Sequence, residues 1–94
     1  MYPNTTKKLT YLTIKEIEEN ILDNCCPTYS CTQYISFNGI KLVADHVGLS
    51  FNTILKIFVP ELKEGASGDN MFDTEGLRNI SKSIFNELIK KYGF

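Results

Sequence analysis

The chain has 94 residues, of which 43% are hydrophobic, 12% aromatic and 22% charged. Such a length and composition are typical of one globular domain, so we expect a single domain over residues 1–94. The longest apolar runs are a few residues, too short to span a bilayer, and the N-terminus lacks the apolar stretch of a secretion signal. We therefore expect a cytoplasmic, intracellular protein with no membrane partner.

The net charge of −1 argues against a protein that depends on strong, non-specific binding to nucleic acid, because such domains are usually basic. The charge is uneven, however. Acidic residues concentrate over residues 61–75, and lysine and arginine concentrate over residues 76–94. A basic surface of modest strength is therefore compatible with the sequence.

The cysteines are Cys25, Cys26 and Cys31, and this odd number excludes a complete disulfide framework. Their spacing matches no zinc pattern, and His46 is the single histidine that could complete a ligand set. We expect reduced thiols that pack as small hydrophobic side chains, with no metal and no cofactor. We expect His46 itself to lie at the surface or half-buried.

The first predicted helix covers residues 14–24. Thr13 and Glu16 have the spacing of a capping box, in which each side chain accepts a hydrogen bond from the other residue's backbone N–H. Leu12 and Ile17 can pack together across the helix start. The apolar face of this helix comprises Ile14, Ile17 and Ile21.

The last predicted helix begins after Asp73 or Thr74 and ends near Gly93, with Lys90 and Lys91 in its final turn. Its apolar stripe has two interpretations that the sequence leaves open. It can pair with a second copy in a homodimer, or it can pack across the rest of the domain. The stripe comprises Leu77, Ile80, Ile84, Phe85, Leu88, Ile89 and Tyr92, of which Leu77, Ile80, Ile84, Leu88 and Tyr92 are the candidate dimer residues.

Residues 34–58 allow two structures that exclude each other. The pair Asn38-Gly39 is a strong signal for a two-residue β-hairpin turn, because both of its positions require a positive φ. That hairpin would place Ile35 and Phe37 on one face with Ile40 and Leu42. The alternative is a helix-turn-helix that turns at Gly48.

The helix-turn-helix needs a small residue where the helices cross and a glycine in the turn. Ala44 and Gly48 supply these, and Ser50 can cap a second helix over residues 51–59. The stretch VADHVGLSFNTILKIF resembles the motif of bacterial and phage helix-turn-helix regulators. The resemblance covers about 20 of the 94 residues, and its specificity is moderate.

The following stretch resembles the wing of winged-helix regulators, in which a leucine and then a glycine lead into a short hairpin. Leu62 and Gly65 stand in those places, and Gly68-Asp69-Asn70 is the expected tip. Residues 33–37 can form the extended segment before the first helix of the motif, with Asn38 as its N-cap. The expected fold is mostly α, with some β: a helix-turn-helix or winged-helix domain with a short hairpin and a long C-terminal helix.

The resemblance implies a small DNA-binding transcription regulator of phage or mobile-element origin, whose helix 51–59 lies in the major groove. Polar side chains on such a helix contact base edges, and hydroxyls and lysines contact the backbone. A lysine in such a place is more often an ordinary solvated surface residue than a phosphate contact. The candidate DNA-binding residues are Ser50, Phe51, Asn52, Thr53, Lys56, Lys41 and Lys63.

A second hypothesis follows from Phe51, Leu55 and Val59, which form an apolar row on the helix that should face DNA. Such a row can pack inside the protein or bind another protein. The alternative function is therefore a non-enzymatic protein-binding module, such as an inhibitor or accessory factor. An enzyme is not expected, because no phosphate loop, dinucleotide motif or second histidine is present.

Overall fold

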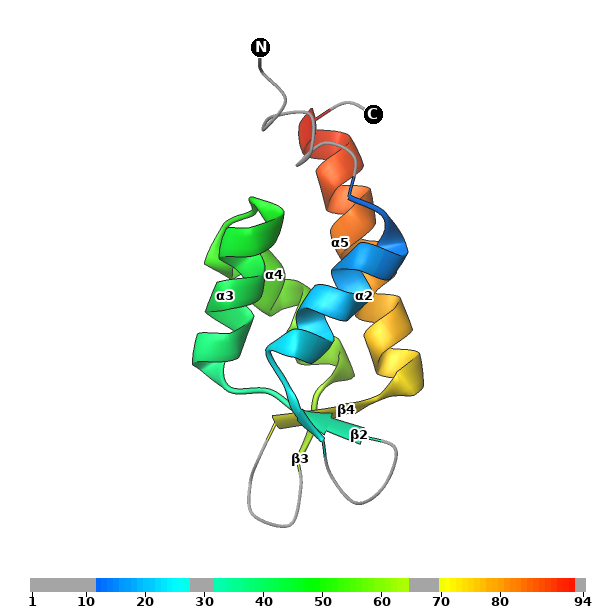
Figure 1. Ribbon diagram of the computed structural model, residues 1–94. Coiled ribbons are helices and arrows are strands. Elements are labelled where there is room, and N and C mark those ends of the chain that lie inside the picture. The colour runs from blue at the N-terminus through cyan, green and yellow to red at the C-terminus, as the bar shows by residue number, and fades with distance from the viewer. Residues whose placement is uncertain (1–11, 28–31, 65–69, 93–94) are drawn as a thin grey trace.

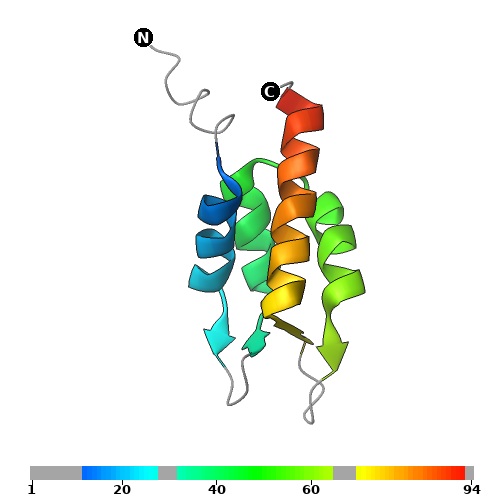
Figure 2. The same cartoon turned by 90° about the vertical axis from the view of Figure 1, so that its right-hand side faces the viewer.

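The computed structural model describes residues 12–27, 32–64 and 70–92. In this part of the chain, four helices stand side by side, and a small antiparallel sheet lies at one end of them (Figures 1 and 2). The helices are α2 (Ile14–Asp23), α3 (Phe37–Val47), α4 (Phe51–Phe58) and α5 (Thr74–Tyr92). Helices α2 and α4 each pack against both α3 and α5, so they occupy opposite corners of the bundle.

The sheet joins the segments that follow α2 and α4 to the segments that precede α3 and α5. Its strands are β1 (Cys26–Pro27), β2 (Thr32–Tyr34), β3 (Lys63–Glu64) and β4 (Asn70–Asp73). Their order in the sheet is β1-β2-β4-β3, and every neighbouring pair is antiparallel. The hairpin of β3 and β4 follows α4 through the short 3-10 helix η1 (Val59–Glu61), as expected for a wing. Of its predicted tip, Gly68 and Asp69 lie outside the described residues.

Helix α2 begins with the predicted capping box. The Glu16 backbone N–H donates to Thr13 Oγ1 at 3.1 Å, and the Thr13 N–H donates to Glu16 Oε1 at 2.9 Å. The helix ends at Asp23, one residue before the predicted end. Two side chains one turn apart, Ile17 and Ile21, are completely buried.

Helix α3 settles the conflict at Asn38-Gly39 in favour of the helix, and the alternative of a hairpin that turns there is wrong. Both residues lie in the first turn of a helix whose N-cap is Ser36, not Asn38, and Ser36 Oγ accepts the Gly39 N–H at 3.0 Å. The glycine serves close packing instead of a turn. A Cβ on Gly39 would lie 2.8 Å from the Asn24 carbonyl oxygen and 2.9 Å from Ile35 Cγ1. Because the segment is helical, four apolar side chains at helical spacing lie on its buried face: Ile40, Val43, Ala44 and Val47.

The turn between α3 and α4 has the predicted glycine and cap. Gly48 has φ of 81°, a left-handed conformation that glycine adopts without a steric penalty, and its N–H donates to the Ala44 carbonyl. Ser50 then caps α4 by accepting the Thr53 N–H at 3.2 Å. The two helices pack together as a helix-turn-helix.

Helix α5 is the long C-terminal helix that the sequence predicts. Asp73 is its cap, because Asp73 Oδ1 accepts the Gly76 N–H at 2.8 Å. Ser81 is a buried polar residue of this helix, and its hydroxyl donates to the Leu77 carbonyl at 2.8 Å, so the buried hydroxyl has a partner.

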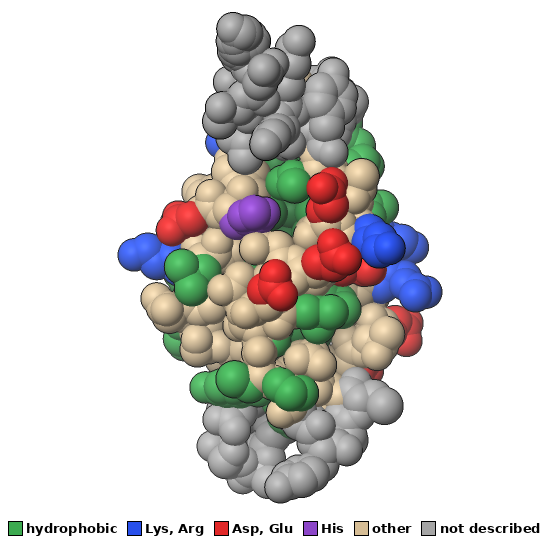
Figure 3. Space-filling model, in the orientation of Figure 1, with side chains coloured by type: hydrophobic (Ala, Val, Ile, Leu, Met, Phe, Trp, Pro, Cys, Tyr) green, Lys and Arg blue, Asp and Glu red, His purple; other side chains and the backbone are tan. Residues whose placement is uncertain are grey.

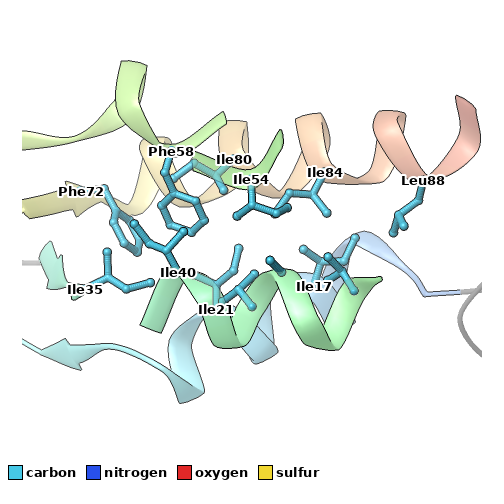
Figure 4. Packing of buried hydrophobic residues seen from close by; sticks show 13 residues of the cluster. Ile17, Ile21, Ile35, Ile40, Ile54, Phe58, Phe72, Ile80, Ile84 and Leu88 are labelled. Atoms are coloured by element: carbon cyan, nitrogen blue, oxygen red, sulfur yellow. The ribbon is translucent and has the colours of Figure 1, made fainter. Parts of the chain in front are cut away.

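One hydrophobic core joins all four helices and the sheet (Figure 4). Phe58 of α4 and Phe72 of β4 meet edge to face in this core, with ring centroids 6.0 Å apart. The other completely buried large side chains are Ile17, Ile21, Ile35, Ile40, Val43, Val47, Ile54, Ile80, Ile84 and Leu88. The predicted fold class is confirmed: the described residues are mostly helical, with four helices of which the C-terminal one is long, and a small antiparallel sheet that includes a short hairpin.

The apolar stripe of α5 packs into this same core within a single chain. Ile80, Ile84 and Leu88 have no exposed surface, while Leu77 and Tyr92 are half-buried against the core. The first three side chains are therefore not available to a second copy without unfolding, which corrects their assignment as dimer contacts. A homodimer through the half-buried Leu77 and Tyr92 of this helix stays a prediction.

Candidate nucleic-acid interface

Helix α4 presents a polar outer face. Its inner side chains Ile54 and Phe58 are completely buried, and this orientation places Asn52 and Lys56 on the exposed side. The two exposed residues are one turn apart, so their side chains lie next to each other on the helix surface. An amide and an ammonium at this spacing can donate hydrogen bonds to base edges or phosphate oxygens.

The apolar row on α4 is partly covered and partly exposed, so each of its two predicted roles, packing inside the protein and surface contact, applies to a part of it. Phe51 and Leu55 are half-buried and pack against the core, whereas Val59 is 56% exposed. Phe51 is therefore a poor candidate for a base contact, because part of its ring is already covered. The row separates the polar face of α4 from α3.

A shallow apolar hollow lies between α3 and the beginning of α4. Phe37, Asn38, Lys41 and Phe51 line it, and its volume is about 480 Å³. Phe37 is 60% exposed, which is unusual for a phenylalanine, and Lys41 brings a positive charge to the same hollow. Phe37 was not predicted as a surface residue, because the sequence patterns placed it on the apolar face of the hairpin or in the extended segment before the helix.

A second, more polar hollow lies where α4 begins, and the far end of α5 contributes to it. Its volume is about 280 Å³, and the backbone that borders it is fixed by two hydrogen bonds to the Gly48 carbonyl. Lys91 Nζ donates to this oxygen at 3.0 Å, and the Tyr92 hydroxyl donates to it at 3.1 Å. The lining residues are Leu49, Ser50, Thr53, Glu87, Lys90 and Lys91.

The hydroxyls of Ser50 and Thr53 lie 2.8 Å apart and share one hydrogen bond. Each hydroxyl carries one hydrogen, so whichever of them donates in this bond, the other can still donate to a ligand. Ser50 is exposed and Thr53 is half-buried. Both predicted contact residues therefore lie at the accessible end of α4.

Lys63 is the predicted contact that is least free. It is exposed at the start of β3, but its Nζ lies 3.1 Å from Asp73 Oδ2. The Gly76 backbone N–H and then the Lys63 ammonium lower the pKa of Asp73 below its ordinary value. Lys63 thus already has an anionic neighbour at the surface, which a phosphate would have to displace.

The opposite corner of the bundle carries a cluster of acidic residues on α2. Figure 3 shows carboxylates gathered in the middle of the face where α2 lies in front. Hydrogen bonds from the backbone N–H and then the hydroxyl of Thr13 lower the pKa of Glu16, and the nearby His46 adds to this effect. His46 is exposed, as expected for an ordinary surface histidine. Helix α2 bears Glu16, Glu18, Glu19 and Asp23 against a single Lys15.

The two described cysteines differ in their surroundings. Cys25 is half-buried, its thiol donates to the Ile21 carbonyl at 2.9 Å, and burial raises its pKa to about 12. Cys26 is exposed, so the prediction of a buried thiol is wrong there. Cys31 lies outside the described residues. Within the described ranges, no three side chains of His, Cys, Asp or Glu come together in a way that could hold a metal ion.

Comparison with protein-family models, with curated proteins and with solved structures yields no match. The resemblance to helix-turn-helix regulators therefore stays a prediction from the residues themselves. No helix within the described ranges combines the length and the apolar character needed to cross a membrane.

Proposed function

We propose that this chain is a small cytoplasmic DNA-binding regulator that places α4 in the major groove and acts without enzymatic chemistry. The observation that carries the proposal is the exposed pair Asn52 and Lys56 on the second helix of a helix-turn-helix. Helices in this position of the motif insert into the major groove, where asparagine can pair with adenine and lysine with guanine or a phosphate.

The distribution of charge supports the proposal more than the net charge does. The carboxylates of α2 lie at one corner of the bundle, and α4 lies at the opposite corner. Lys41 borders α4 from the side of α3, and Lys56 lies on α4 itself. DNA that approaches α4 therefore meets Lys41 and Lys56, with the Glu87 carboxylate in the hollow where α4 begins, while the acidic surface of α2 lies at the opposite corner.

The test is the affinity for a mixed-sequence duplex, measured by fluorescence anisotropy between about 50 and 200 mM salt. We expect salt-dependent binding that weakens on Asn52→Ala and on Lys56→Ala, by roughly 1–3 kcal/mol for a base contact. Lys15→Ala is the matched control, because Lys15 is also a single exposed lysine on a short helix. Loss of this lysine should leave the affinity unchanged or weaken it slightly by a general charge effect, and by much less than Lys56→Ala does.

Two results would contradict the proposal. One is the absence of salt-dependent binding by the unmodified chain. The other is an equal loss of affinity for Lys15→Ala and Lys56→Ala, since this would show a response to net charge instead of contact with α4.

The hollow at Phe37 favours a second candidate function, the binding of another protein. Phe37 and Val59 are 60% and 56% exposed, and apolar surface of this kind often marks a protein contact. Two variants distinguish the two candidate functions. A protein-binding module would lose its partner on Phe37→Ser and keep it on Lys56→Ala, whereas the DNA-binding regulator shows the reverse dependence.

A further inference from the structure

The end of α5 reaches the beginning of α4, although the two segments are about 40 residues apart in sequence. Lys91 Nζ and the Tyr92 hydroxyl both donate to the Gly48 carbonyl, two residues before Ser50. Lys90 and Lys91 thereby line the same hollow as Ser50 and Thr53. The helix pattern explains these lysines as ordinary C-terminal residues, but it does not explain their position beside the candidate DNA-binding helix.

The hollow offers donors that are still free to bind an anion. Lys91 uses one of its three N–H donors on Gly48, which leaves two. Lys90 is 75% exposed and contacts Glu87 Oε2 at 3.5 Å, a long separation for an ion pair in water. One hydroxyl hydrogen of the Ser50 and Thr53 pair also remains available.

We propose that Lys90 and Lys91, together with the hydroxyls of Ser50 and Thr53, form a subsite for a backbone phosphate of duplex DNA. The inference rests on the proposed function and deepens it, because it assigns a DNA contact to α5. A phosphate in this hollow lies beside the first turn of α4, so it fixes the depth and direction at which α4 enters the groove. Phosphate contacts of this kind orient a protein on DNA without distinguishing its sequence.

Glu87 is the group that opposes this assignment, and it also provides a sharp test. Its carboxylate lines the hollow and competes with the phosphate for Lys90. Because the pair is exposed, a phosphate can displace it at little cost. Removal of the carboxylate by Glu87→Gln should therefore tighten DNA binding by up to about fivefold, the range that an exposed ion pair allows. Damage to the fold cannot produce a tighter complex.

The experiment measures duplex affinity against salt concentration for the full chain and for four variants. A lysine that contacts a phosphate contributes about one unit to the slope of log affinity against log salt. We expect Lys90→Ala to reduce that slope by about one, equally for unrelated duplex sequences, and Lys90→Arg to restore it. Lys82→Ala is the control, because Lys82 is an exposed lysine of α5 that does not line the hollow. Glu87→Gln should increase the affinity.

The outcomes separate the two proposals. If the unmodified chain binds DNA and weakens on Asn52→Ala, but Lys90→Ala leaves the slope unchanged, the phosphate subsite is refuted and the DNA function stands. An equal change of slope for Lys82→Ala and Lys90→Ala also refutes the subsite. If the unmodified chain shows no salt-dependent binding, both proposals fall together.

Discussion

Helices α2 and α4 are built alike on the inside and differently on the outside. Each begins at a hydroxyl cap and buries two large apolar side chains four residues apart, against the same partners α3 and α5. Their outer faces diverge: α2 carries carboxylates, and α4 carries an amide, a lysine and a partly exposed apolar row. The inner side chains thus hold both helices in place, and the outer side chains of each are free to serve a function.

The first prediction tests whether the two inner faces are equivalent. Phe58→Ala on α4 should lower the free energy of unfolding by about 3–5 kcal/mol, and Ile21→Ala on α2 by about 2–5 kcal/mol. Both side chains are completely buried, and Phe58 also loses its edge-to-face contact with Phe72. Urea denaturation followed by circular dichroism measures both losses. A loss below about 1 kcal/mol at either position would show that this helix is not held by the common core.

The second prediction concerns the contact that joins α2 to α3. Gly39→Ala places a methyl group 2.8 Å from the Asn24 carbonyl oxygen at the end of α2, and backbone cannot move aside as a flexible side chain can. We expect a loss of about 1–3 kcal/mol in the free energy of unfolding, the usual cost of overpacking. The same denaturation experiment measures it. An unchanged or increased stability would contradict the close approach of these helices.

The third prediction compares the two caps. Thr13→Ala and Ser50→Ala should each cost about 1 kcal/mol of stability, because each leaves a helix N–H without its side-chain acceptor. Only Ser50→Ala should also weaken DNA binding, since Ser50 lies beside α4 and Thr13 lies at the acidic corner. Parallel denaturation and anisotropy measurements separate the two effects. Equal DNA affinities for the two variants would show that Ser50 does not contact DNA.

The smallest expected effect is on how the stability of the fold depends on acidic pH. Glu16 and Asp73 have pKa values below their ordinary values of 4.5 and 3.8, because hydrogen bonds favour their charged forms. The stability they contribute is complete above these ordinary values and is lost as the pH falls through the lower pKa values of the folded state. Glu16→Gln should therefore make the stability of α2 less sensitive to pH below about 4.5. Urea midpoints at several acidic pH values test this, and an unchanged pH dependence would contradict it.

The sequence predicted the helices well where caps and periodicity agreed. Thr13 with Glu16, Gly48 with Ser50, and Asp73 all mark helix ends that the structure contains. The residues around Asn38-Gly39 alone could not decide between a hairpin turn and a helix. The helix there depends on burial against α2 and α4, and the glycine is required by a neighbour from another segment, the Asn24 carbonyl.

Only the part of the candidate site on α4 could be predicted from the sequence. The polar residues of α4 follow from helical periodicity once the turn at Gly48 is placed. Lys90 and Lys91 could not be connected with them, because their position depends on how α5 crosses the bundle. The contacts at the Gly48 carbonyl join residues 43 and 44 positions apart, and no local pattern indicates such a pairing. For the same reason the sequence could not decide whether Ile80, Ile84 and Leu88 pack inside the chain, where the structure buries them, or against a second copy.

The most direct test of the central claim is an amide NMR titration of the chain with a mixed-sequence duplex at low salt. We predict that the amides of residues 50–56 and of Lys90 and Lys91 shift on addition of DNA, while those of α2 do not, and that the shifts shrink as salt is added. Shifts that spread equally over α2 and α4, or the absence of any shift, would contradict a DNA-binding face on α4.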